Sequence, residues 1–135
     1  MRITGPLTRD AVDATRRVQL EALAVRPSGM AFLLDASGDV SLPPADVRDY
    51  AAEMAAKHPA GMLVHVTLMP GDGFRKSALR GALTGIFVLA RSPYPRFVVA
   101  DVDEAHERIR RALGEDAPLR SEVSAALDQL RDMAE

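Results

Sequence analysis

Apolar and polar positions follow two different periods along this chain of 135 residues. Short apolar runs such as Met30–Asp35 and Met62–Leu68 have the length and composition of buried strands. Between them, apolar residues recur every three to four positions, as on one face of a helix, and turns rich in proline and glycine separate the segments. The pattern predicts strands over about 2–4, 30–35, 62–68 and 97–100, and helices over about 8–25, 44–55, 74–90, 103–113 and 119–133.

This alternation of strands and helices, with two helices at the end, predicts a single α/β domain. We expect an about four-stranded, mostly parallel sheet with covering helices, formed by residues 1–114, and an extra C-terminal helix over 115–135. That last helix is expected either to pack on the domain or to serve in dimerisation. The first helix is expected to begin after the cap residue Thr8 and to bury one stripe, Ala11, Ala14, Thr15, Val18, Ala22 and Val25.

The segment 82–90 is apolar on nearly every side, which is unusual for a helix that covers one face of a sheet. One explanation is burial beneath the C-terminal helix. The alternatives are a dimer contact, a groove for a partner, or the wall of an apolar ligand pocket, with Phe87 as the candidate contact.

Composition narrows the range of functions. With 17 basic and 19 acidic residues the net charge is −2, which gives no electrostatic reason to expect nucleic acid or a membrane surface as partner. The absence of cysteine excludes disulfides, thiolate metal ligands and thiol nucleophiles. No apolar segment follows the first residues as in a signal peptide, and no apolar run reaches the length of a membrane span, so a cytoplasmic location is expected.

The turn over 71–77 lies between a strand and a helix, where phosphate-binding loops occur. It is one residue shorter than a P-loop, and Arg75 stands where the second glycine should be, so nucleotide hydrolysis is not expected. The helix N-terminus and its basic residues form a possible anion site. Its members are Gly73, Arg75, Lys76 and Arg80. The favoured alternative is a glycine-rich turn with solvated basic side chains.

No arrangement of residues indicates catalysis, a metal or a cofactor. The three histidines have no metal-type spacing, and no serine lies in a nucleophile motif. Four aspartates are expected near the carboxyl ends of strands: Asp35, Asp39, Asp101 and Asp103. Two such carboxylates can bind Mg²⁺ or share a proton, but capping of the next helices is favoured. An enzyme would require Asp35, Asp101 and a histidine to converge.

Four segments give the chain a resemblance to the STAS-like group, the sulphate-transporter and anti-sigma-factor-antagonist domains, including small divergent bacterial members. They occur in the family's order across about residues 2–112, at Ile3–Thr8, Phe32–Gly38, Leu79–Thr84 and Tyr94–Ala105. The chain departs from the pattern at the start of the second helix, where phosphorylated antagonists have Asp-Ser-Ser-Gly and this chain has Leu42–Ala45. The phospho-acceptor serine is missing. The family's usual additional strand before Ile3 has no counterpart here either.

The resemblance implies a non-enzymatic module that binds another protein in signalling, or itself as a homodimer. The surface it implies lies on the turn and first residues of the second helix, with Ser37, Asp39, Ser41, Asp46 and Val47 as its members. The alternative function is that of a small-ligand binding protein, which holds an anion near Gly73–Arg80 or an apolar molecule beside Phe87.

Overall fold

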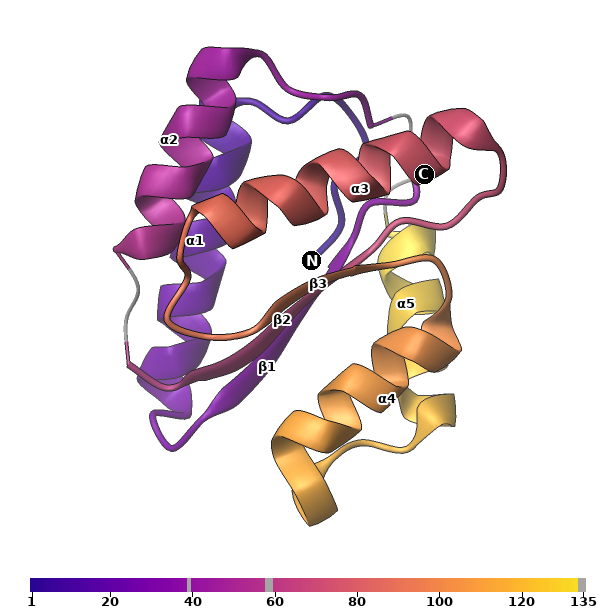
Figure 1. Cartoon of the computed structure of the whole chain (residues 1–135). Coiled ribbons are helices and arrows are strands. Elements are labelled where there is room, and N and C mark those ends of the chain that lie inside the picture. The colour runs from indigo at the N-terminus through magenta and orange to yellow at the C-terminus, as the bar shows by residue number, and fades with distance from the viewer. Residues whose placement is uncertain (39, 58–59, 134–135) are drawn as a thin grey trace.

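A parallel sheet of three strands forms the centre of the fold, in the order β1 (Met30–Asp35), β2 (Met62–Leu68) and β3 (Arg96–Val99) (Figure 1). The computed structural model describes residues 1–38, 40–57 and 60–133. The predicted α/β class and single small domain are confirmed, and the three longer strands lie within a residue of their predicted positions.

The predicted fourth strand over 2–4 is wrong, because this segment makes only a single parallel bridge between Arg2 and Asp35. The amide of Ile3 donates to the Asp35 carbonyl, and the Asp35 amide donates to the Met1 carbonyl, both at 2.8 Å. If this pairing continued as a parallel ladder, the Ser37 amide would donate the next hydrogen bond to the N-terminal segment. That amide instead donates to the Asp35 side chain at 3.1 Å, which ends the pairing after one step.

Helices cover both faces of the sheet (Figure 1). On one side lie α1 (Arg9–Val25), α2 (Ala45–Ala56) and α3 (Phe74–Leu89). On the other lie α4 (Val102–Leu113) and α5 (Arg120–Asp132), joined by a 3-10 turn at Gly114–Asp116. The expected burial of 82–90 beneath the C-terminal helix is therefore wrong, since α5 packs with α4 on the opposite face from α3.

Local signals set the helix ends. The Thr8 hydroxyl accepts the Ala11 amide at 3.2 Å, and the Asp101 carboxylate accepts the Glu104 amide at 2.8 Å, so each side chain caps its helix. Gly114 ends α4 at a φ of +62°, in the region that favours glycine. The caps at Thr8 and Asp101 are the ones expected from the sequence.

The buried face of α1 differs from the predicted stripe. Its two buried residues are Gln19 and Leu23, whereas Val18 and Val25 are 40% and 81% exposed. Leu23 packs into a cluster with Phe32 and other residues from the sheet. A search for apolar periodicity does not find Gln19, because Gln19 is polar. Its burial depends on a hydrogen-bond partner that lies far away in the sequence.

The buried carboxylate of Asp35 joins distant parts of the chain. Its side chain is fully buried, and one oxygen accepts the Arg131 Nε of α5 at 3.0 Å. Arg2 also reaches α5, donating to the Arg131 carbonyl at 3.0 Å. Since the backbone of Asp35 holds Met1 and Ile3, one residue ties the N-terminal segment, β1 and α5 together.

We predict that Arg131→Met lowers the free energy of unfolding by about 2–4 kcal/mol, because it leaves the Asp35 carboxylate buried without its counter-ion. Urea denaturation measures the loss. The control is Asp128→Asn, which removes an exposed carboxylate 3.7 Å from the same guanidinium and is expected to cost less than about 0.5 kcal/mol. Equal losses in the two variants would contradict a dominant role for Asp35.

Candidate functional site

A pocket lies beneath α2, on the side that faces the sheet. The helix packs mainly against α1 and α3, and its inward positions carry small side chains such as Ala51 and Ala55. Two adjoining cavities of about 100 and 70 Å³ fill the space that these small residues leave. We call the pair the α2 pocket. Its polar lobe is the cavity of about 100 Å³, and its apolar lobe is the cavity of about 70 Å³. The lobes share Ile3, Leu7, Leu34, Ala51 and Phe87.

His65 forms the base of the polar lobe. On β2, Val64, Val66 and Leu68 face α4, so the alternation of the strand directs His65 and Thr67 toward the pocket. The His65 ring is buried, with the Gln19 amide nitrogen 3.4 Å from Nδ1 and the Thr67 hydroxyl 3.4 Å from Nε2. The Phe32 ring packs edge-on against it, with 5.2 Å between centroids.

Arg96 lies at the side of the polar lobe and is held by two aromatic residues. Its Nη2 and Nε donate to the Tyr94 hydroxyl at 2.6 and 3.1 Å. The guanidinium also lies over the Phe87 and Tyr94 rings, at 5.0 and 5.1 Å from their centroids. These contacts fix the plane of the guanidinium beside the cavity.

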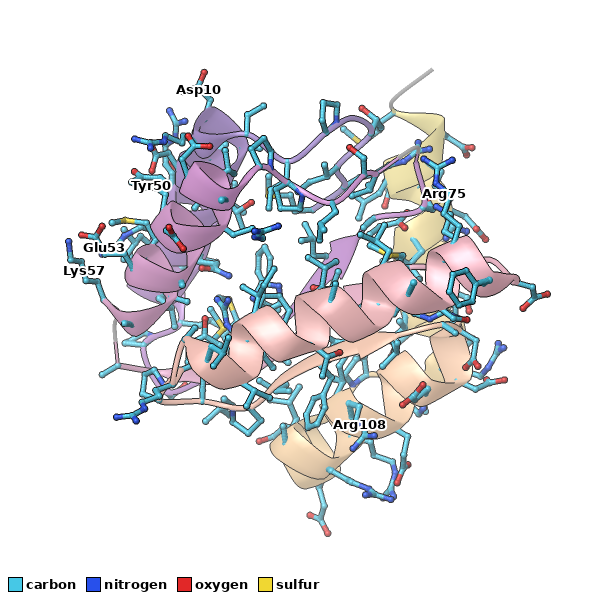
Figure 2. The ribbon with its side chains drawn as sticks, turned by 45° about the horizontal axis from the view of Figure 1, so that its top comes forward. Asp10, Tyr50, Glu53, Lys57, Arg75 and Arg108 are labelled. Atoms are coloured by element: carbon cyan, nitrogen blue, oxygen red, sulfur yellow. The ribbon has the colours of Figure 1, made fainter. Side chains whose placement is uncertain are left out.

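Two further basic residues line the polar lobe, from α1 and α2. Arg16 donates from Nη1 to the Met54 carbonyl at 3.3 Å. Lys57 is paired with Glu53, and Figure 2 shows these two side chains together at one end of α2. No aspartate or glutamate is among the described residues that line either lobe.

The apolar lobe extends from the shared residues toward α3 and the turn before α2. Its wall is almost entirely apolar, and the one cation among the described residues that line it, Arg48, donates to the Pro43 carbonyl at 3.4 Å. The side chains that close it are Ala36, Val40, Pro43, Met69, Leu83 and Ile86. A water molecule there would lack the two to four polar partners that buried water requires.

The partner surface expected over 37–47 contains both buried and exposed residues. Val47 is buried, 8% exposed, so its side chain is not presented to a partner. Asp46 is exposed and forms an ion pair with Arg9 at 3.3 Å. Ser37 is half-buried, and Ser41 is exposed at the edge of the apolar lobe. Asp39 lies outside the described residues.

The expected anion site at the start of α3 is used mostly for internal contacts. Gly73 precedes the helix at a φ of +94°. Lys76 donates to the Gly38 carbonyl at 3.3 Å, and Arg80 donates to the carbonyls of Gly71 and Met69 at 2.8 and 3.2 Å. Arg75 is exposed at the beginning of α3 (Figure 2).

Of the other candidates, Phe87 lies where the apolar-pocket alternative requires, because it lines both lobes. Asp35 and His65 do not converge, since the first side chain meets α5 and the second faces α1 across the sheet. Asp101 caps α4. Within residues 1–38, 40–57 and 60–133, no group of three histidine, aspartate or glutamate side chains could hold a metal ion.

The sequence did not reveal four polar residues that line the pocket, Gln19, Thr67, Arg16 and Arg96. His65 did carry a signal in the sequence, because it stands in the middle of a mostly apolar strand. Gln19 carried no such signal, because its partner is 46 positions away.

The fold and pocket define an α/β protein with a three-stranded parallel sheet and a ligand-sized space beneath one covering helix. Comparison of the chain with protein-family models, with curated proteins and with solved structures found no match. The likeness to STAS-like domains therefore rests on the four sequence segments alone. Among the described residues, no helix combines the length and apolar character needed to cross a membrane.

We predict that Arg80→Ala lowers the free energy of unfolding by about 1–2 kcal/mol, because it removes hydrogen bonds to two backbone carbonyls of the turn. Chemical denaturation measures this loss. Arg17→Ala is the control, since Arg17 is exposed on α1 and is expected to change stability by less than about 0.5 kcal/mol. A change of the same size in both variants would show that Arg80 does not fasten the turn.

Proposed function

We propose that this protein binds a small, largely apolar molecule in the α2 pocket. The observation that carries the proposal is the pair of adjoining lobes beneath a helix whose inward side chains are too small to fill them. Together the two volumes are comparable to the cavity of about 150 Å³ that holds benzene in an engineered protein core. A ligand of roughly the size of one aromatic ring with a short chain fits this space.

The energetics of the apolar lobe support an occupant. The lobe is partly open to solvent, and its wall carries almost no polar group that could hold water in place. A bound apolar molecule would remove apolar surface of this wall from water, at about 25 cal/mol per Å². It would also supply the contacts that the wall lacks.

The polar groups of the pocket support the recognition of a particular ligand, rather than the mere filling of the cavity by any apolar molecule. Binding sites for small molecules are mostly apolar and carry a few polar groups that orient the ligand. Here His65, Gln19 and Arg96 are confined to one lobe, so the pocket has a polar end and an apolar end. The protein-binding surface expected from the sequence has less support, because Val47 is buried and Asp46 is paired with Arg9.

We predict that Ala51→Leu abolishes binding of phenylpropanol, a neutral probe with one aromatic ring, because Ala51 lines both lobes. Titration calorimetry of the wild-type chain is expected to give a Kd on the order of 1 mM or below, as ligand-efficiency limits allow for ten heavy atoms. The variant is expected to keep or raise its stability by up to about 2 kcal/mol, since about 0.8 kcal/mol accompanies each buried methylene.

The matched control is Ala56→Leu, the same substitution at an exposed position of α2. It is expected to bind phenylpropanol as the wild-type chain does. Undiminished binding in Ala51→Leu would contradict the proposal, as would a wild-type chain that binds neither phenylpropanol nor the corresponding carboxylate, phenylpropionate. Native mass spectrometry of the freshly purified protein then identifies any molecule retained from the host.

A further inference from the structure

Two of the three arginine and lysine residues that line the polar lobe have no acidic partner among the described residues, although the chain as a whole carries a net charge of −2. Lys57 has Glu53 as its partner. Arg16 and Arg96 have no carboxylate within ion-pair distance in the described part of the chain. Two uncompensated guanidinium groups beside a half-enclosed apolar space favour a ligand that brings a negative charge.

We infer that the ligand is a small monocarboxylate, whose carboxylate lies against Arg96 and whose apolar part occupies the apolar lobe. This inference rests on the proposed function, and adds the chemical class of the ligand to it. A guanidinium presents several N–H donors in a rigid plane and binds a carboxylate through two parallel hydrogen bonds.

The contacts of Arg96 leave donors available for such a ligand. Nε and Nη2 share one acceptor, the Tyr94 hydroxyl, and Nη1 has no hydrogen-bond partner among the described residues. The stacking of Phe87 and Tyr94 against the guanidinium holds its plane before a ligand arrives, which reduces the entropy lost on binding. Arg96 is therefore positioned in advance to receive an anion.

The remaining polar groups of the lobe do not compete for this role. His65 lies within hydrogen-bonding distance of Gln19 and Thr67, and it contacts the ring of Phe32. The wall of the apolar lobe is almost entirely apolar and therefore favours uncharged groups. The charge of the ligand thus belongs at Arg96, with Arg16 as a second cation that lines the same lobe, and its ring or short chain belongs beside Leu83 and Ile86.

The test compares phenylpropionate with phenylpropanol, two probes that differ in carrying a carboxylate or a hydroxyl. The wild-type chain is expected to bind phenylpropionate at least about tenfold more tightly, and to lose most of that preference in high salt. Arg96→Gln is expected to weaken phenylpropionate binding by about tenfold or more while changing phenylpropanol binding by less than about twofold.

Arg17→Gln is the control, because it removes a neighbouring positive charge from the exposed side of α1 and is expected to leave both affinities unchanged. If the wild-type chain binds both probes equally, the carboxylate inference fails and the pocket proposal stands. If it binds neither, both fail. The comparison of the two probes in the wild-type chain needs no variant, so the inference can be overturned even where Arg96→Gln does not fold.

Discussion

The buried carboxylate of Asp35 is the contact on which the arrangement of the chain depends. Its side chain holds α5 through Arg131, and its backbone holds the N-terminal segment through Met1 and Ile3. Ile3 and, a few residues later, Leu7 form walls of both lobes of the α2 pocket. A charge buried on one face of the sheet thus sets the position of a pocket wall on the other face. Removing one partner of a buried ion pair is strongly destabilising, because the other charge is then left buried without compensation.

The pocket itself follows from the sizes of a few side chains. α2 contains no leucine, isoleucine or phenylalanine, and the alanines that it directs inward cannot fill the distance to β2. On the opposite face Val64, Val66 and Leu68 meet α4 and α5 in a continuous core. Successive residues of β2 point to opposite faces of the sheet. The aliphatic residues therefore pack tightly on the face toward α4, whereas His65 and Thr67 point to the other face, where the pocket lies.

The sequence was sufficient for features that depend on neighbours along the chain. The strands at 30–35 and 62–68 and the caps at Thr8 and Asp101 follow from local period and local hydrogen bonding. Features that depend on distant partners were wrong or missed. The fourth strand ends after one bridge because the Asp35 side chain takes the next amide, and α1 buries Gln19 because His65 is opposite it. Phe87 was found as a pocket contact because an apolar helix that is not fully covered is visible in the sequence itself.

Open parallel sheets usually bind ligands at the carboxyl ends of their strands, and here that edge is used for structural contacts. At the end of β1, Asp35 is committed to Arg131, and after β3, Asp101 caps α4. At the end of β2, the Met69 carbonyl accepts from Arg80. The α2 pocket lies instead between the sheet and α2, and its polar lobe is lined by two guanidinium groups, those of Arg16 and Arg96, that have no carboxylate partner among the described residues. The α2 pocket meets β2 at His65, in the middle of that strand, and β3 at its first residue, Arg96, so motifs located at the carboxyl ends of strands did not reveal it.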